Sequence, residues 1–434
     1  MSVTISQSTI EGTIQAPPSK SYTHRAMICG LLSSGPTIIR NHLVCDDTSA
    51  TLHLSRMMGA KITHDKNLII TGAETLKAPD TEMDCLGSGT TLRLFSGISA
   101  LTNGRCVLTG DSSLQKRPIG ELLDALNQLG IRASSINNND RPPVEIHGNI
   151  IEGTTVKIRG DISSQYISGL LFACSKGSNE SKIEITTQLK SRPYVEMTLE
   201  VLKHFGVTAE HSDNWQVISI PGNQTYHNSQ YEVPGDYSSA AFLMVAGALA
   251  GKVKINGLRK ESLQGDSHIV KILKEMGVSI SQSQSAITVT KSEPEPTSID
   301  ATNIPDIIPV LSVLASQAEG QTRIFNAERL RYKESNRLKT TIMELRKMGA
   351  DLKETKDGII INGPTKLHGA VIDPHGDHRI AMACAVACLV SKHSVTINNI
   401  DCVNKSYPDF IDDMISLGTQ IEYATMINDR SNAE

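Results

Sequence analysis

Short groups of serine, lysine and arginine recur where the sequence also predicts the start of a helix. The N-terminal end of a helix carries unpaired N–H groups and partial positive charge, so it attracts anions and disfavours cations. Repeated cations at such places indicate a ligand with several negative charges, although each group alone is explained by ordinary capping and solvated side chains. The groups are Ser19-Lys20-Ser21 with Arg25, Gly87-Ser88-Gly89-Thr90, Lys116-Arg117-Pro118, Ser163-Ser164-Gln165, Ser191-Arg192-Pro193-Tyr194, residues 333–337, residues 376–379 and Lys405-Ser406.

Two carboxylates lie among these cations and are candidates for acid-base chemistry. Asp306 begins a predicted helix, and Glu334 lies between Lys333 and Arg337. Either could be a helix cap or a surface ion pair. In a cleft crowded with cations, each would be held ionised or poised for proton transfer. His378 is a further candidate because it precedes an arginine in the same kind of helix start.

The sequence shows no motif typical of a metal site or of a covalent nucleophile. No His, Cys, Asp or Glu set has the spacing of metal ligands, and there is no nucleophile elbow or Cys-His pairing. We therefore expect no metal, no covalent nucleophile and no cofactor.

The elements that carry these groups recur six times along the chain. An apolar helical stretch ends in glycine and leads into a strand-like stretch, with the glycines spaced about 70 residues apart. Each glycine is expected to cap its helix in the left-handed conformation. A unit of this length with two helices and several strands is a βαβ-type module, and six units make two halves of three. The marker glycines are Gly59, Gly130, Gly206, Gly277, Gly349 and Gly418.

A Pro-Gly turn within residues 231–237 lies between the third and fourth units, and Ala16-Pro17-Pro18 makes a matching turn before the first helix. We expect the first strand to belong to the C-terminal half, so that the chain crosses twice between the halves. The predicted domains are residues 1–18 with 234–434, and residues 19–233. The predicted site is the cleft between them.

Composition excludes several classes of protein. The chain has 434 residues, a net charge of −4 and no apolar run long enough to span a bilayer. This charge argues against a general nucleic-acid binder. Its eight cysteines are scattered without a CxxC pair, and its N-terminus lacks the pattern of a secretion signal. We expect a cytoplasmic protein with no membrane or nucleic-acid partner.

Taken together, the motifs resemble those of the 5-enolpyruvylshikimate-3-phosphate synthase family. The resemblance runs in order from about residue 10 to residue 412. It rests on SKSxxxRA at 19–26, GTTLR at 89–93, LTGDSSLQKRPIGELLDAL at 108–126, SSQ, SRPY, IPD, RYKESNRL, GDHRIAMA and NKSYPDF. It implies an α/β fold of two similar, hinge-connected domains. Each domain would have three βαβαββ repeats with helices at the core, an inside-out α/β barrel.

The resemblance also implies a reaction in which the 5-hydroxyl of shikimate 3-phosphate adds to phosphoenolpyruvate, with Asp306 as base, Glu334 as acid and Lys20 sharing the proton work. The enzyme is expected to act as a monomer. The implied shikimate 3-phosphate contacts are Lys20, Ser21, Arg25, Ser163, Ser164, Gln165, Ser191, Tyr194, Asp306 and Lys333. The implied phosphoenolpyruvate contacts are Lys20, Gly89, Thr90, Arg117, Gln165, Arg337, Arg379 and Lys405.

Two positions depart from the family pattern and are left out of the predicted site. Gly87 stands where an Asn usually opens its loop, and Arg329 stands where several members have Asn.

The alternative functions are those of the related transferase that acts on UDP-N-acetylglucosamine, a non-catalytic anion-binding protein and an RNA-end-processing relative. The first has Lys-Asn near its start and a loop cysteine, whereas this chain has Lys20-Ser21 and Leu114-Gln115-Lys116.

Overall fold

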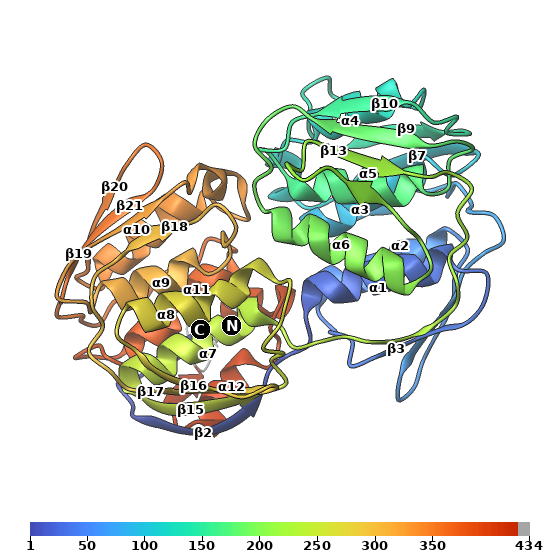
Figure 1. Cartoon of the computed structure of the whole chain (residues 1–434). Helices are drawn as coiled ribbons and strands as arrows, with labels where there is room; N and C mark the ends of the chain where they lie inside the picture. The colour runs from blue at the N-terminus through green and yellow to red at the C-terminus, as the bar shows by residue number, and fades with distance from the viewer. Residues whose placement is uncertain (424–434) are drawn as a thin grey trace, which may run out of the picture.

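A computed structural model describes residues 1–423 and shows two lobes of mixed α/β structure (Figure 1). Each lobe has its own hydrophobic core. The N-lobe is defined by a core whose buried residues lie between Tyr22 and Val233. The C-lobe is defined by a second core, which draws on residues 3–16 and 237–417. The expected two-domain, inside-out α/β fold is confirmed, since each lobe repeats one helix-and-sheet unit three times.

Residues 1–423 form twelve α-helices, six in each lobe (Figure 1). The N-lobe helices are α1 (Lys20–Leu32), α2 (Asp46–Met57), α3 (Gly89–Ser99), α4 (Gly120–Gln128), α5 (Ser164–Cys174) and α6 (Arg192–His204). The C-lobe helices are α7 (Tyr237–Ala250), α8 (Ile269–Glu275), α9 (Ile308–Ala315), α10 (Arg337–Lys347), α11 (His378–Cys388) and α12 (Phe410–Ser416). Short 3-10 helices are η1 (Leu114–Lys116), η2 (Gly265–His268), η3 (Glu328–Tyr332) and η4 (Ile400–Lys405).

In the described part of the chain, the strands form six four-stranded sheets, three in each lobe. The N-lobe strands are β3 (Thr37–Arg40), β4 (Lys61–His64), β5 (Leu68–Thr71), β6 (Met83–Asp84), β7 (Gly104–Thr109), β8 (Arg132–Ser135), β9 (Val144–Gly148), β10 (Thr155–Ile158), β11 (Ser181–Ile185), β12 (Glu210–His211), β13 (Val217–Ile220) and β14 (Gln230–Glu232). The C-lobe strands are β1 (Val3–Ile5), β2 (Ile10–Gln15), β15 (Gly251–Asn256), β16 (Ser279–Gln282), β17 (Ala286–Thr290), β18 (Ser298–Asp300), β19 (Gly320–Phe325), β20 (Asp351–Glu354), β21 (Ile359–Gly363), β22 (Val371–Ile372), β23 (Val395–Ile397) and β24 (Ile421–Tyr423).

Five sheets repeat one pairing pattern. In each, an edge strand runs parallel to its neighbour, and an antiparallel hairpin completes the sheet, as in the order β10-β11-β13-β12. The sixth sheet, β22-β23-β1-β24, takes the N-terminal strand β1 into the place of the hairpin's inner strand. The N-terminal residues therefore complete a sheet of the C-lobe.

The first helix of each unit lies inside its lobe. Every residue of α7, α9 and α11 is buried, which suits helices that are apolar or small-residued on all faces. The sheets cover these helices from outside (Figure 1). Because the inner helices pack against one another, their N-terminal ends can gather at one place.

The marker glycines cap the second helix of each unit as expected. All six have positive φ, from 75° at Gly277 to 106° at Gly59. A residue with a side chain is strained in this left-handed region. Glycine therefore ends each helix without that strain and turns the chain into the next strand.

The chain passes twice between the lobes, and the two passages touch. Pro18 and Gly235 form an isolated bridge, and the backbone N–H of Ser19 donates to the carbonyl oxygen of Pro234 at 2.8 Å. On the C-lobe side, β2 runs parallel to β15, while on the N-lobe side β14 runs parallel to β3. The two lobes are thus connected by two adjacent segments of the chain.

Within residues 1–423, none of the helices combines the length and the hydropathy that crossing a membrane requires.

Candidate active site

A cavity of about 620 Å³ lies between the lobes and takes its lining from both. The first turns of α1, α3, α5, α7 and α11 form much of its wall. Side chains of Ser88, Ser163, Asp236 and Asp377 cap four of these helices by accepting backbone N–H groups. Remaining N–H groups and the helix dipoles make this wall attractive to anions.

Most of the residues that the sequence predicts for the site line this cavity. They come from separate units of both lobes, so the fold brings together residues up to 359 positions apart, from Lys20 to Arg379. The predicted residues on the wall are Lys20, Ser21, Gly89, Thr90, Arg117, Ser163, Ser164, Gln165, Ser191, Tyr194, Asp306, Lys333, Glu334, His378 and Arg379.

Three predicted residues lie behind the wall instead. Arg25 donates to the carbonyl oxygens of Ser21 and Tyr194, both at 2.8 Å, so its guanidinium holds these two residues in place. Arg337 is completely buried and is bonded to carboxylates. Lys405 is directed at neighbouring polar groups of the N-lobe. In this conformation, Arg25 and Arg337 support the cavity lining rather than forming it.

Cationic groups converge on the cavity, and some of their nitrogens have no acceptor. Among the described residues, one guanidinium nitrogen of Arg379 is buried without a hydrogen-bond partner, and so are both ring nitrogens of the neutral His378, one of which can donate. Unsatisfied buried donors are costly, so they indicate a ligand or water that accepts from them. An anionic ligand with several oxygens fits this requirement.

Asp306 accepts hydrogen bonds from three directions. Arg337 donates at 2.8 Å, Lys333 at 3.3 Å and the hydroxyl of Tyr194 at 3.3 Å. Burial alone would raise the pKa of Asp306, but Arg379 and the other nearby cations hold that pKa well below its usual range. The carboxylate is therefore ionised.

Glu334 lies between arginines of the two lobes. Its carboxylate is 3.0 Å from the NH2 nitrogen of Arg117 and is bonded to Arg337 on the other side. Burial raises its pKa, but Arg117 and Arg337 outweigh burial and hold the pKa well below its usual range. The hydroxyl of Ser113 also donates to the backbone oxygen of Glu334 at 2.9 Å, which fixes the loop before α10.

The protonation of the other candidates follows from their neighbours. Burial lowers the pKa of Lys20, but Asp47, Cys45 and Glu334 together outweigh this effect and the net pKa is raised. Burial lowers the pKa of Lys333, and Asp306 does not fully compensate. Burial and then Arg379 lower the pKa of His378 well below its usual value, so its ring is neutral.

Three further residues belong to this site although the sequence does not single them out. Arg93 donates to the side-chain oxygen of Gln165 at 2.7 Å, and Arg329 donates to the hydroxyl of Ser191 at 3.0 Å. Asp47 accepts from Lys20 at 2.7 Å. All three line the cavity. Arg93 falls within the GTTLR motif, and Arg329 stands at a position that departs from the family pattern. Asp47 belongs to an Asp-Asp pair at a helix start, which is an ordinary capping signal.

Metal ligation has no support in the described part of the chain. Residues 1–423 contain no group of three or more His, Cys, Asp or Glu residues arranged to hold a metal ion.

Comparisons with known proteins agree on one family. The family model described as EPSP synthase (3-phosphoshikimate 1-carboxyvinyltransferase) matches residues 5–414. A Methanosarcina mazei protein named 3-phosphoshikimate 1-carboxyvinyltransferase is 44% identical over 430 residues, covering 97% of this chain and 99% of its own. A Methanococcus maripaludis protein of the same name is 43% identical over 419 residues, covering 95% and 97%.

Solved structures agree with the fold. An EPSP synthase from Acinetobacter baumannii is 29% identical, with a TM-score of 0.81 over 98% of this chain and all of its own. The enolpyruvyl transferase NikO from Streptomyces tendae has a TM-score of 0.79 over 98% of each chain. At 19% identity, the second likeness concerns the fold alone.

Proposed function

The chain belongs to the EPSP synthase (3-phosphoshikimate 1-carboxyvinyltransferase) family, and from this premise we infer that it transfers the enolpyruvyl group of phosphoenolpyruvate to the 5-hydroxyl of shikimate 3-phosphate. The products are 5-enolpyruvylshikimate 3-phosphate and phosphate, on the route to chorismate and the aromatic amino acids. The observation that carries this function is the inter-lobe cavity, which places two ionised carboxylates among cations.

Shikimate 3-phosphate is proposed to bind on the side of Ser163, Ser164 and Ser191. Hydroxyl groups and helix N–H groups there suit its phosphate. Arg25 would act through Ser21 and Tyr194, whose backbone oxygens it holds. The remaining proposed contacts are Lys20, Ser21, Gln165, Tyr194, Asp306 and Lys333.

Phosphoenolpyruvate is proposed to bind against Arg117 and Arg379, because the planar guanidinium groups suit carboxylate and phosphate oxygens. The partnerless nitrogen of Arg379 supports this place for an anion. Arg337 would act from behind the wall through the carboxylates that it holds. The remaining proposed contacts are Lys20, Gly89, Thr90, Gln165 and Lys405.

In the proposed mechanism, Asp306 takes the proton of the 5-hydroxyl while the oxygen of that hydroxyl bonds to C2 of phosphoenolpyruvate. Glu334 delivers a proton to C3, which makes a methyl group and a non-covalent tetrahedral intermediate. Glu334, now a carboxylate, takes a proton back from C3 as the bond from C2 to the phosphate oxygen breaks and phosphate leaves. The surrounding cations stabilise the charge on the departing phosphate, and the closed lobes keep water from the intermediate.

Glu334 must gain a proton before it can act as an acid. Its pKa is held low by Arg117 and Arg337. An anionic substrate that shares Arg117 would weaken that effect and let the carboxyl bind a proton. His378 would act as a neutral hydrogen-bonding group, and Lys20 as a fixed positive charge that shares the proton work.

A direct test is to incubate the purified protein with both substrates and identify the products by mass spectrometry. Formation of 5-enolpyruvylshikimate 3-phosphate with an equal amount of phosphate supports the proposal. Recovery of shikimate 3-phosphate unchanged contradicts it.

Two alternative functions have less support. The transferase specific for UDP-N-acetylglucosamine carries a cysteine on the loop before its Arg-Pro element, and residues 110–118 contain none. A protein that only binds anions has no need for Asp306 and Glu334 beside so many cations.

We also propose domain boundaries at residues 18/19 and 233/234, supported by the pairing of β2 with β15 and of β14 with β3. The protein is proposed to act as a monomer in the cytoplasm. One chain supplies the whole lining of the cavity, and all eight cysteines are free. Light scattering after gel filtration tests the monomer, and a mass of two chains contradicts it.

A further inference from the structure

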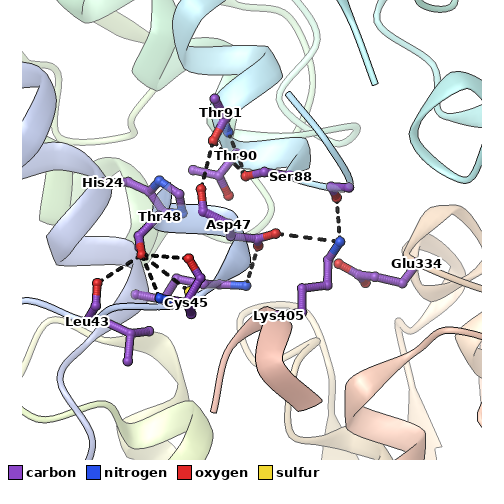
Figure 2. Close-up of polar contacts among 12 residues, drawn as sticks. His24, Leu43, Cys45, Asp47, Thr48, Ser88, Thr90, Thr91, Glu334 and Lys405 are labelled. Carbon is purple, nitrogen blue, oxygen red and sulfur yellow. Dashed lines mark hydrogen bonds and ion pairs between the residues drawn. The ribbon is translucent and has the colours of Figure 1, made fainter. Parts of the chain in front are cut away.

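One carboxylate of the N-lobe lies between two ammonium groups that belong to different lobes. Asp47 is the second residue of α2 and is 4% exposed. Its Oδ2 accepts from Nζ of Lys20 in the same lobe at 2.7 Å, and its Oδ1 lies 3.5 Å from Nζ of Lys405 in the C-lobe. Figure 2 shows Lys405 reaching toward Asp47, with Glu334 beside it. Asp47 thus joins two lysines of the proposed phosphoenolpyruvate site.

A glycine makes room for this arrangement. Nζ of Lys405 also donates to the backbone oxygen of Gly87 at 2.5 Å. A Cβ atom on residue 87 would collide with that same nitrogen. Gly87 therefore lets Lys405 rest against the N-lobe backbone and within reach of Asp47, and the departure from the family pattern at residue 87 has a structural counterpart.

The charge on Lys20 depends on Asp47. Burial lowers the pKa of Lys20, and Asp47 is the largest influence in the opposite direction, ahead of Cys45. Arg379 lowers the pKa of Lys20 and Glu334 raises it, but both act less strongly. Burial raises the pKa of Asp47, and its net pKa is lowered because Lys20, Lys405 and His24 face it.

Asp47 also has a structural position that must be separated from this role. It lies in the first turn of α2, where a carboxylate stabilises the helix dipole. Its backbone oxygen accepts from the hydroxyl of Thr91 at 3.2 Å, a bond that a side-chain substitution leaves in place. Its neighbour Asp46 is in the same turn but exposed, so it provides a matched control for the helix effect.

We propose that Asp47 is a positioning residue for the transfer reaction, which holds the ammonium groups of Lys20 and Lys405 in place against phosphoenolpyruvate. The inference rests on the proposed function. The two lysines approach from opposite lobes, so the carboxylate sets their separation when the lobes are closed. Without it, the ammonium groups would repel each other and move apart, and the anion site would lose a fixed pair of charges.

The test compares Asp47→Asn with Asp46→Asn and Asp47→Glu. We expect Asp47→Asn to lower kcat/KM for phosphoenolpyruvate by about tenfold or more, since truncating a buried charge pair costs at least that factor. Because Lys20 is also a proposed contact of shikimate 3-phosphate, the dissociation constant of that substrate should rise by a smaller factor than the loss in kcat/KM for phosphoenolpyruvate. Asp46→Asn should behave like the unmodified protein, and Asp47→Glu should recover part of the loss because it restores the charge.

A pH profile separates the positioning role from a loss of helix stability. Without Asp47, burial dominates and the pKa of Lys20 falls, so the alkaline loss of kcat/KM should begin at lower pH. The same shift should be visible without catalysis. Acetylation of Lys20 by a trace of acetic anhydride at pH 8, followed by peptide mass spectrometry, should be faster in Asp47→Asn.

The outcomes distinguish the two proposals. An unmodified protein that makes no product counts against the function, while the acetylation rate still tests the pairing of Asp47 with Lys20. Unchanged kcat/KM, alkaline limb and acetylation rate in a folded Asp47→Asn protein would overturn the positioning role. Equal losses in the Asp46→Asn and Asp47→Asn proteins would also overturn it, because the effect would then belong to the helix.

Discussion

Arg117 of the N-lobe and Glu334 of the C-lobe meet across the cavity, with 3.0 Å between the NH2 nitrogen of the arginine and Oε1 of the glutamate. The pair joins a cation proposed for phosphoenolpyruvate to the proposed acid. Because the same guanidinium faces both, binding of the substrate and the pKa of Glu334 are linked. An arriving anion would draw Arg117 away from Glu334 and let the carboxyl take up a proton.

Replacing Glu334 by Gln tests its role as acid. The amide has nearly the same size but cannot give up a proton, and general acid catalysis contributes about 10²- to 10⁴-fold to a rate. We expect turnover to fall by about a hundredfold or more, with binding of shikimate 3-phosphate nearly unchanged in calorimetry. Unchanged turnover would reject the assignment.

Replacing Gly89 by Ala tests the place of Arg117. A Cβ atom at residue 89 would collide with the NH1 nitrogen of Arg117 and lie 3.2 Å from that of Arg93. Arginine side chains are flexible at this end, so the protein should fold with Arg117 displaced. Steady-state kinetics should show KM for phosphoenolpyruvate raised about tenfold and KM for shikimate 3-phosphate little changed. A rise confined to shikimate 3-phosphate would place Arg117 at the other substrate.

Replacing Arg329 by Ala tests a residue that the sequence does not predict for the site. Arg329 lines the cavity, donates to Ser191 at 3.0 Å and has a buried Nε nitrogen with no partner among residues 1–423. We expect KM for shikimate 3-phosphate to rise by about tenfold, and the preference for shikimate 3-phosphate over shikimate to shrink. A matched control is Arg331→Ala, because Arg331 pairs with Glu354 away from the cavity wall. Equal effects of the two substitutions would contradict a specific role.

Much of this architecture could be predicted from the sequence because it depends on local rules. The six glycines mark helix ends wherever the backbone needs positive φ, and all six have it. Helices α1, α3, α5 and α11 begin at the residues where apolar stretches follow capping residues. Helix α9 begins at Ile308, two residues after the predicted start at Asp306, with Pro309 in its first turn.

The depth of a side chain could not be predicted in the same way. Arg25 and Arg337 occur in the same kind of motif as Lys20, yet other protein groups already bond to their guanidinium groups. Asp47 and Arg329 belong to the site because they contact residues distant in the sequence. Asp47 contacts Lys20, 27 positions away, and Arg329 contacts Ser191, 138 positions away. Such contacts depend on how units pack across the cavity, and spacing along the chain does not encode that packing.

His24 should make folding stability depend on pH. It is completely buried, its Nδ1 is 2.7 Å from the hydroxyl of Thr51, and burial lowers its pKa to about 3. The unfolded chain binds a proton at this histidine below its ordinary value of 6.5, while the folded protein does not. Its contribution is therefore complete above pH 6.5 and is lost as pH falls toward about 3.

Replacing His24 by Gln should remove this dependence. In urea unfolding between pH 5 and 6.5, the slope of unfolding free energy against pH should be smaller by about 1.4 kcal/mol per pH unit at most. The substituted protein is less stable at every pH if its packing suffers, but only the slope reports the proton. An unchanged slope would mean that His24 is not the group that titrates.

The central claim is the identity of the acceptor, and it is tested most directly by phosphate release from phosphoenolpyruvate with either shikimate 3-phosphate or UDP-N-acetylglucosamine added to the purified protein. We predict release only with shikimate 3-phosphate. Release only with the nucleotide sugar would contradict the acceptor assigned to the side of Ser163, Ser164 and Ser191, and release with neither would leave the protein an anion binder rather than a transferase.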